Sequence, residues 1–307
     1  MTPVARSRDA IVAGIAITHP DRVVYPDSGI TKIELAQYIA EIGPLMLPHV
    51  ARRPLSLVRC PDGTAGTCFF QKHWPGKPPD VLDSVPIVQG DGATRRYVAV
   101  RDVTGLVALI QWGVMEIHPW GARSDDPDHP DRIIFDLDPG PGVTWKATQQ
   151  AARGLGALLD ELGLSSWLKT TGGKGLHIVV PITRRNSWDQ VSDFARAVAA
   201  QMESVFPDQF IIKASKAERK GLIFIDWLRN TRGATAIAPW CPRARADAGV
   251  SVPISWEQLG RVKRGNYFTL PKLRRAIPRI DDPWSDLLAS RQGITLAMVR
   301  SLKKNSD

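Results

Sequence analysis

The chain has few cysteines and no long apolar run. Its 307 residues include three cysteines, Cys60, Cys68 and Cys241, and no Cys-x-x-Cys pair. The odd count and the spacing argue against a zinc knuckle and a disulfide framework, so we expect a cytosolic protein with reduced thiols. No stretch reaches the ~20 apolar residues of a membrane span, and the N-terminus lacks the apolar core of a signal peptide. We therefore expect no membrane partner and no export by that route.

Acidic residues are also scarce relative to basic ones. The chain has 31 Asp and Glu against 40 Lys and Arg, a formal charge of +9 and an isoelectric point near 9.7. This excess favours a polyanionic partner, usually nucleic acid, provided that the charge gathers around a site. Clusters such as Arg52-Arg53 and the stretch from Arg261 to Arg279 suggest that it does.

The spacing of apolar and turn residues predicts a mixed α/β fold of the α+β class. We expect a single domain, 1–307, with a strand-rich N-terminal part (1–101), a core (102–255) and a tail of short helices and basic loops (256–307). Thr31 and Glu34 have the spacing of a capping box and predict a helix that ends before Gly43-Pro44.

The most informative segment is Ile133–Asp138, an apolar run that ends in Asp136 and Asp138 and is broken by Pro139-Gly140. Side chains alternate along a strand, so the two aspartates share a face, with Cα atoms roughly 6 to 7 Å apart. Their carboxylates are then placed to bind one divalent ion or to bridge two. A strand whose last residues are polar because they face water would show the same pattern. The aspartate pair alone therefore favours neither a metal site nor a solvent-facing strand end.

A third aspartate, Asp226, lies in the apolar stretch 222–228. An unpaired charge buried there would cost several kcal/mol, so a partner must compensate it. Arg229 is one candidate and would make the role of Asp226 structural. The functional alternative makes Asp226 the third ligand of a site for Mg²⁺ or Mn²⁺.

The glycine-rich stretch 169–177 has the composition of a phosphate-binding loop. Its glycines let backbone N–H groups approach phosphate oxygens, and Lys174 adds a positive charge. It matches neither the P-loop nor the dinucleotide-binding spacing, and a purely structural turn is the alternative. His177 is placed to donate to the same phosphates, although a lone histidine is more often a satisfied polar residue.

Two further pairs have weaker signals. Arg243 and Arg245 alternate and would reach one anionic group from an extended segment, although solvated surface arginines are the simpler interpretation. Phe69 and Phe70 cannot both face a core from one strand, which leaves one ring free to stack on a base. The alternative for this pair is one buried and one half-exposed ring.

The letters F-D-L-D at 135–138 also begin the nucleophile motif of haloacid-dehalogenase-type phosphatases. In that motif Gly-Thr follows, whereas here Pro139-Gly140 follows. A metal-dependent phosphohydrolase with Asp136 as nucleophile therefore stays only as an alternative. A basic nucleic-acid-binding module without catalysis is the other alternative.

The combination of motifs resembles the polymerase domain of bacterial ATP-dependent DNA ligase D, a member of the archaeo-eukaryotic primase superfamily used in non-homologous end joining. Several independent motifs that occur in order are more specific than any one of them. The segments that carry the resemblance are His19–Pro26, Thr31–Lys32, Glu116–Trp120, Phe135–Pro139, Thr171–His177, Ile225–Asp226 and Arg232–Thr235.

The resemblance implies a primase-like catalytic core of two β-sheets flanked by helices, and a template-dependent nucleotidyltransferase that prefers ribonucleotides. It implies that Asp136, Asp138 and Asp226 hold two Mn²⁺ or Mg²⁺ ions and are the catalytic residues. His118 would lie near the incoming nucleotide. The residues that would bind the triphosphate are Thr171, where the family usually has serine, Gly173, Lys174, His177, Arg243 and Arg245.

The resemblance also implies how DNA is recognised. Arg22 and Lys32 would grip the 5′-phosphate of the downstream strand at gaps and broken ends, and Phe69 and Phe70 would stack against the template. The implied partners are such DNA, NTP or dNTP, Ku and the ligase module of the same pathway, in the nucleoid of the bacterial cytoplasm. The Lys-x-Asp-Gly motif of the ligase is absent, so we expect a stand-alone relative or an excised domain.

Overall fold

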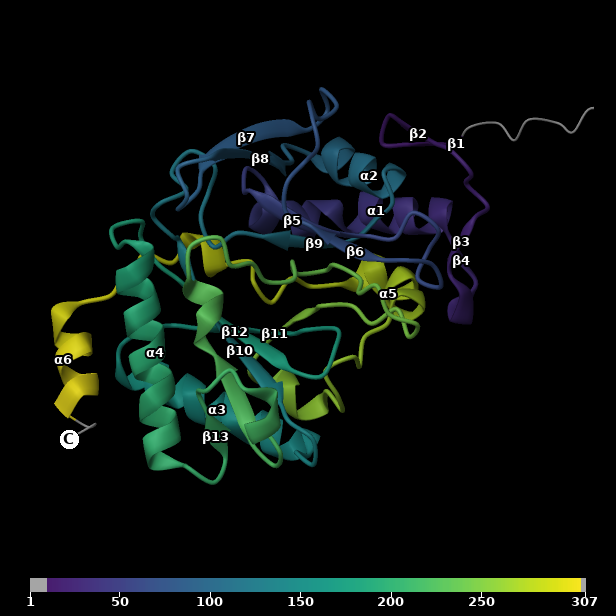
Figure 1. Cartoon of the computed structure of the whole chain (residues 1–307). Helices are drawn as coiled ribbons and strands as arrows, with labels where there is room; N and C mark the ends of the chain where they lie inside the picture. The colour runs from purple at the N-terminus through teal and green to yellow at the C-terminus, as the bar shows by residue number, and fades with distance from the viewer. Residues whose placement is uncertain (1–9, 305–307) are drawn as a thin grey trace, which may run out of the picture.

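The computed structural model describes residues 10–304, and two large β-sheets dominate it (Figure 1). The first nine and last three residues of the predicted domain lie outside the described residues. The larger sheet is antiparallel except for its β13–β14 pair. In spatial order its strands are β13 (Phe210–Ile211), β14 (Ile223–Asp226), β10 (Arg132–Pro139), β12 (Leu176–Pro181), β11 (Trp167–Thr170) and β15 (Pro253–Ile254).

The second sheet has five strands and is formed mainly by the N-terminal part of the chain. Its strands are β6 (Phe69–Gln71), β5 (Leu55–Arg59), β8 (Thr94–Ala99), β7 (Asp83–Val88) and β9 (Val114–Pro119), which pairs with β5. Two small hairpins precede it, β1 (Ala10–Val12) with β2 (Ile15–Ile17) and β3 (Val23–Tyr25) with β4 (Ile30–Thr31). Two main sheets flanked by helices confirm the α+β class that the sequence predicts.

The first long helix begins where the sequence places its cap. Thr31 forms the predicted capping box with Glu34, and Ser187 forms a second one with Gln190. The helices are α1 (Lys32–Val50), α2 (Val103–Gln111), α3 (Trp145–Glu161), α4 (Trp188–Val205), α5 (Leu270–Ala276) and α6 (Leu296–Lys304). Within residues 10–304, none of them is both long and apolar enough to cross a membrane.

The predicted end of the first helix is wrong. Helix α1 continues through Pro44 and Pro48 to Val50. Each proline removes one backbone donor, but Met46 and Val50 are completely buried in the core. Burial of this apolar face therefore outweighs the weakened hydrogen bonding, as expected for a helix that tertiary packing stabilises.

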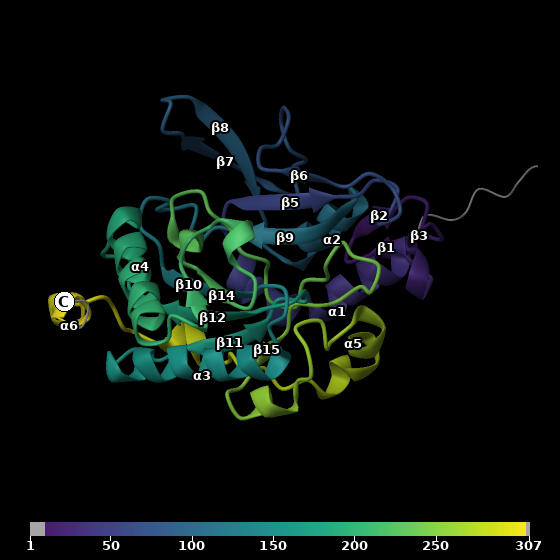
Figure 2. The same ribbon diagram turned by 60° about the horizontal axis from the view of Figure 1, so that its bottom comes forward.

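Strand β10 divides its side chains between the core and the opposite face of the larger sheet. Ile133, Phe135 and Leu137 are completely buried in the main core cluster, which also contains the apolar faces of α3 and α4. Those helices lie against this side of the sheet (Figure 2). The alternation places Asp136 and Asp138 together on the other face, as the sequence predicts.

The expectation of reduced thiols is wrong for two of the three cysteines. Cys60 and Cys68 form a disulfide, whereas Cys241 is free and buried. Cys60 directly follows β5 and Cys68 directly precedes β6. These strands pair antiparallel with Arg59 opposite Phe69, so the hairpin register brings the two cysteines together. Cysteine spacing alone cannot reveal a bridge that depends on this register.

The C-terminal tail folds back onto the larger sheet. The indole N–H of Trp284 donates to the carbonyl of Leu168 at 3.0 Å, and that of Trp256 donates to Ser166 at 2.9 Å. The segment that contains Gly265 also packs on the glycine-rich loop. A Cβ at Gly265 would lie 2.6 Å from the carbonyl carbon of Lys174. The tail is therefore part of the wall around the loop.

Candidate active site

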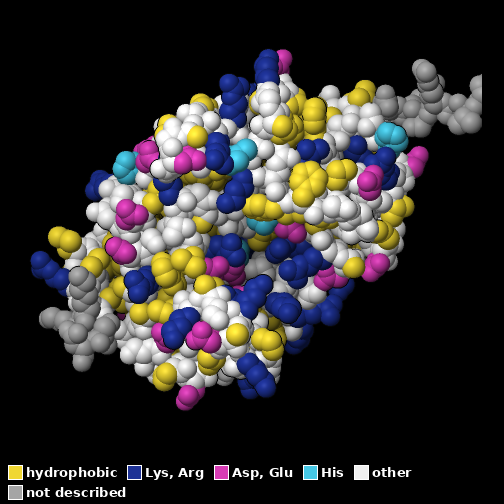
Figure 3. Space-filling view, in the orientation of Figure 1, with side chains coloured by type: hydrophobic (Ala, Val, Ile, Leu, Met, Phe, Trp, Pro, Cys, Tyr) yellow, Lys and Arg dark blue, Asp and Glu magenta, His cyan; other side chains and the backbone are white. Residues whose placement is uncertain are grey.

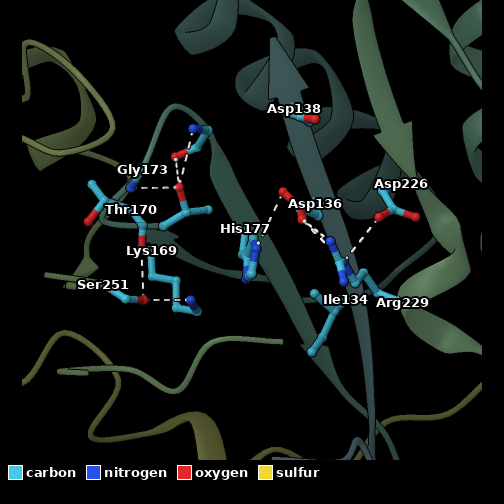
Figure 4. A network of polar contacts seen from close by, with 12 residues as sticks. Ile134, Asp136, Asp138, Lys169, Thr170, Gly173, His177, Asp226, Arg229 and Ser251 are labelled. Carbon is cyan, nitrogen blue, oxygen red and sulfur yellow. Dashed lines mark hydrogen bonds and ion pairs between the residues drawn. The ribbon is translucent and has the colours of Figure 1, made fainter. Parts of the chain in front are cut away.

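Four polar residues form a row across the larger sheet, one from each of four strands. Asp226 on β14 is paired with Asp136 on β10, and Asp136 is paired with His177 on β12. His177 is in turn paired with Lys169 on β11. Cross-strand partners point to the same face, so the four side chains lie side by side (Figure 4). The register thus combines two aspartates with two residues of the glycine-rich stretch.

Two arginines neutralise the aspartates. Arg229 lies between Asp136 and Asp226, with its Nη2 3.2 Å from one carboxylate and its Nε 3.1 Å from the other (Figure 4). Asp138 pairs with Nη1 of Arg219 at 3.0 Å. The suggestion that Arg229 compensates the charge of Asp226 is therefore confirmed, and the same arginine serves Asp136.

The three carboxylates differ in how easily they ionise. Burial alone would raise the pKa of Asp136, but its interactions with His177, Arg229 and Lys169 outweigh burial and lower that pKa. Burial and the nearby Asp136 charge instead raise the pKa of both Asp138 and Asp226. Like charges therefore repel within this group, and an added cation would relieve the repulsion.

The donor set suits a hard divalent cation. Three carboxylates lie on neighbouring positions of β10 and β14, and oxygen ligands of this kind are preferred by Mg²⁺ and Mn²⁺. Among residues 10–304, no three Asp, Glu, His or Cys side chains already converge as a metal-binding group. The reason is visible in the ion pairs, because the Asp136 and Asp226 carboxylates converge on Arg229. A divalent cation would replace guanidinium contacts with its own.

The other half of the row is buried and short of hydrogen-bond partners. Nε2 of His177 lies 3.4 Å from Asp136, whereas its Nδ1 is buried without a partner in the described structure. Burial, with Lys169 nearby, lowers the pKa of His177 to about 4. Burial likewise lowers the pKa of Lys169 to about 7, and its ammonium group donates to the Ser251 hydroxyl at 2.6 Å.

The glycine-rich loop is held in shape by Thr171. The hydroxyl of Thr171 accepts from the N–H groups of Gly173 and Gly175, each at 3.2 Å. Its side chain therefore organises the loop from inside. Gly175 is required by close packing, because a Cβ there would lie 2.1 Å from the Leu137 carbonyl oxygen on β10. Lys174 is the exposed residue of the loop.

Arg243 and Arg245 flank this loop, as the phosphate hypothesis requires. Arg243 donates to the carbonyl of Thr171 at 3.1 Å. A Cβ at Gly173 would lie 3.3 Å from Nη1 of Arg245. The structure thus brings both arginines to the loop, although each of these two contacts spans 72 positions of the sequence.

Glu116 connects the arginines to His118. One carboxylate oxygen of Glu116 lies 3.0 Å from Nε of Arg243, and the other lies 2.8 Å from Nε2 of His118. Burial raises the pKa of Glu116, but His118 and Arg243 outweigh it and lower that pKa to about 2. A permanently charged carboxylate therefore orients two of the predicted nucleotide-binding residues.

The predicted template-stacking pair lies next to His118. The ring of Phe70 meets His118 edge to face, with centroids 5.8 Å apart. Phe69 and Phe70 are 43% and 50% exposed, so both rings are accessible rather than one. Arg59 lies over the Phe69 ring, 5.6 Å from its centroid.

Arg22 and Lys32 face a separate pocket of about 360 Å³ beside α2. The Lys32 ammonium group donates to the carbonyl of Thr18 at 3.0 Å and to the side-chain oxygen of Gln111 at 2.7 Å. Burial and the neighbouring Arg22 lower the pKa of Lys32. The pocket therefore contains two adjacent positive charges. Nη1 of Arg22 also lies 3.5 Å from a carboxylate oxygen of Asp62, whose side chain is mostly exposed.

Sequence reasoning missed Glu116, Lys169 and Arg219 as contributors to this region. Glu116 lies in the segment Glu116–Trp120, two positions before His118, and Lys169 begins the glycine-rich stretch, two positions before Thr171. This closeness to predicted site residues was the available signal. Arg219 had no local signal, because its contact with Asp138 spans 81 residues.

Comparisons with known proteins point to one family. A family model described as the LigD primase-polymerase domain matches residues 31–284. The multifunctional non-homologous end joining protein LigD of Pseudomonas aeruginosa is 40% identical over 296 residues, which cover 95% of this chain and 35% of that protein. Its counterpart from Mycolicibacterium smegmatis is 34% identical, with 90% of this chain and 36% of that protein covered. The chain thus spans about a third of these relatives.

A solved structure gives the same result at the level of the fold. The polymerase domain of Mycobacterium tuberculosis ligase D in complex with DNA is similar with a TM-score of 0.83 and 29% identity, over 90% of this chain and 98% of that one. The family match covers most of the chain, and the phosphatase and non-catalytic alternatives are set aside. The chain belongs to the LigD primase-polymerase domain family and is a nucleotidyltransferase of the polymerase type.

Proposed function

We propose that this domain fills gaps and extends 3′ ends at DNA double-strand breaks during bacterial non-homologous end joining, with ribonucleotides as preferred substrates. The observation that carries the proposal is the position of the Asp226–Asp136–His177 row directly beside the glycine-rich loop. A carboxylate site for cations and a phosphate site then share one surface. This combination serves transfer of a nucleotide from its triphosphate.

Asp136, Asp138 and Asp226 are the residues that would hold two Mn²⁺ or Mg²⁺ ions. When bound, such ions lower the pKa of a primer 3′-hydroxyl and stabilise the charge of the transferring phosphoryl group. Arg229 keeps two of these carboxylates in position by pairing with both. The pKa values of Asp138 and Asp226 are raised in part by repulsion from the Asp136 charge, which a bound cation would relieve.

The triphosphate would lie along the glycine-rich loop. Lys174, Arg243 and Arg245 supply positive charge, and Glu116 holds the Arg243 side chain at its position. His177 offers its unpartnered Nδ1 as a further polar contact for a phosphate oxygen or its bound water. His118 would contact the nucleotide near the exposed Phe69 and Phe70 rings, which would stack on the template.

The pocket of Arg22 and Lys32 supports recognition of a downstream 5′-phosphate. Two cations face a cavity large enough for a phosphate group, and Lys32 uses only neutral oxygen acceptors. Recognition there would favour gaps and broken ends over open primers. The solved relative is a polymerase domain in complex with DNA, which agrees with DNA as the substrate. Ku and a ligase module are the proposed partners, in the bacterial cytoplasm at the nucleoid.

The main test is extension of a gapped duplex that carries a 5′-phosphate, with NTP and Mn²⁺. Asp136→Ala and Asp226→Ala should each lower the rate at least ~10³-fold, because each removes a carboxylate from the cation site. Asp160→Ala, on the exposed side of α3, is the control and should extend normally. Release of phosphate without extension by the unaltered protein would overturn the polymerase proposal.

A second experiment separates the 5′-phosphate pocket from the catalytic site. Lys32→Ala should weaken use of a 5′-phosphorylated gap by roughly tenfold, the loss of one charge-assisted contact. Extension of an open primer should stay at the level of the unaltered protein. Equal loss on both substrates would contradict the proposed role of Lys32.

A further inference from the structure

A second groove lies between the C-terminal tail and the edge of the larger sheet. It has a volume of about 410 Å³, and its lining includes Arg261, Lys272 and Arg279 together with apolar residues of β15 and α5. The residues of the polar row, the glycine-rich loop and the Arg22 pocket do not belong to its described lining. The groove is therefore distinct from the sites described above.

The charge of the groove is one-sided. Residues 258–280 contain Lys and Arg but no Asp or Glu. Arg261 and Arg279 are exposed, and among the described residues neither has a carboxylate within ion-pair distance. Asp281 is the one acidic side chain in the described lining. Exposed cations that lack an internal partner are complementary to an anionic ligand.

The floor of the groove is aromatic. Tyr267 and Phe268 meet edge to face with centroids 5.1 Å apart, and both are partly exposed. Lys272 lies over the Tyr267 ring at 5.7 Å. Trp240 also belongs to the lining, and its indole N–H is buried without a partner in the described structure. Flat apolar faces suit a nucleobase, and cations at the rim suit the phosphates on either side of it.

The segment that lines the groove also packs against the glycine-rich loop. The backbone at Gly265 packs against the loop so closely that a Cβ there would lie 2.8 Å from the Gly173 carbonyl oxygen. Gly265 lies between Arg261 and Tyr267, so the segment that forms the groove is the same one that supports the loop. Lys and Arg side chains gather near the middle of the face in Figure 3.

We propose that this groove binds a single-stranded stretch of nucleic acid, with one base on the Tyr267–Phe268 floor and the flanking phosphates at Arg261 and Arg279. The inference rests on the proposed function, in which strand ends at a break are the substrate. It adds a binding surface that holds a strand away from the cation site and from the 5′-phosphate pocket.

Fluorescence anisotropy with a labelled oligothymidylate, without NTP and without divalent metal, tests the groove directly. The double variant Arg261→Gln, Arg279→Gln should raise the Kd roughly tenfold near 0.1 M salt and lower the slope of log K against log salt by about 1.4, the loss of two phosphate contacts. The control is Arg185→Gln with Arg300→Gln, which removes the same charge from exposed positions outside the groove. Equal losses in the two double variants would overturn the proposal.

An oligonucleotide with abasic sites tests the base contact. The unaltered protein should bind it several-fold more weakly than oligothymidylate with the same number of phosphates, because an abasic site removes the base that would stack on an aromatic ring. Equal affinity would overturn the base site, and binding of a polyglutamate peptide in preference to the oligonucleotide would identify a protein partner instead. Failed extension by the unaltered protein, with intact binding of oligothymidylate, would refute the polymerase proposal and leave the groove proposal standing.

Discussion

The two ends of strand β10 use aspartate in opposite ways. Asp131, just before the strand, is bound by both terminal nitrogens of Arg53 at 2.7 and 2.5 Å. Arg123 and Arg132 add contacts at 3.2 and 3.4 Å. Five residues later, Asp136 shares the single guanidinium of Arg229 with Asp226. One end has more arginine than carboxylate, and the other has more carboxylate than arginine.

The difference indicates which end exchanges its partners. Arg53 is completely buried, whereas the side chain of Arg229 is 39% exposed. A buried carboxylate that already contacts several arginines gains little from a further cation. Removal of such a carboxylate would leave the buried arginines without a negative partner. An undercompensated group beside an exposed arginine can accept a metal ion instead. The Asp131 end is therefore structural, and the Asp136 end is suited to a ligand.

The largest expected effect comes from Asp131→Asn. This change leaves Arg53 and Arg132 buried without a carboxylate, and it should lower the free energy of unfolding by about 3–5 kcal/mol. Urea denaturation measures the loss. Asp136→Asn is the matched change at the other end; it should lower stability by less than Asp131→Asn does, and it should abolish extension. Similar stability losses for the two variants would erase the distinction between the ends.

The next effect concerns His49, which lies in the same arginine-rich cluster as Asp131. Burial, with Arg132 and Arg53 nearby, lowers the pKa of His49 to about 3 from 6.5. Between these values the unfolded chain binds a proton that the folded protein does not, so stability falls as the pH falls. From pH 7 to pH 5 this group should cost about 2 kcal/mol.

The matched variant for this prediction is His49→Phe, which keeps an aromatic ring against Trp284. Its unfolding free energy should fall less between pH 7 and pH 5 than that of the unaltered protein. Denaturation at the two pH values gives the comparison. An identical pH dependence in both proteins would show that the positive end of β10 does not keep His49 neutral.

The smallest effect tests whether Arg229 competes with a cation for the carboxylates. Arg229→Gln should lower stability by roughly 1–2 kcal/mol, a value reduced by solvent screening at this partly exposed site. Added Mn²⁺ should raise the Tm of this variant more than that of the unaltered protein, because no guanidinium has to be displaced. Arg196→Gln is the control, since Arg196 lies over the Trp227 ring and, within residues 10–304, forms no ion pair with an aspartate. If Mn²⁺ raised the Tm of Arg229→Gln and of the unaltered protein equally, Arg229 would not compete with the cation for the carboxylates.

Local patterns predicted the parts of the site that lie on one element. The alternation in Ile133–Asp138 placed Asp136 and Asp138 on one face, because strand geometry is the same wherever a strand occurs. The glycine-rich loop and the paired arginines were recognised by composition, and the structure brings them together. Their roles toward nucleotide, metal and DNA stay predictions, as does the division of the chain at 101 and 255.

Patterns failed where contacts cross between elements. The Cys60–Cys68 disulfide depends on hairpin register, and the extension of α1 past Pro44 depends on core packing. Glu116 had no predicted role of its own within its motif. In the structure it contacts both His118 and Arg243, and Arg243 lies 127 positions further along the chain. None of these contacts leaves a periodic trace in the sequence.

The sequence by itself determined the fold class, the helix start at Thr31 and the candidate aspartates, because caps and side-chain periodicity are local properties. Tertiary structure decided which charges meet. Strand register placed Asp226, Asp136, His177 and Lys169 in one row. Tertiary packing also brought three arginines to Asp131, whereas Asp136 and Asp226 pair with the same arginine, Arg229. Long-range register and burial decide such pairings, and these arise only when the whole chain has folded.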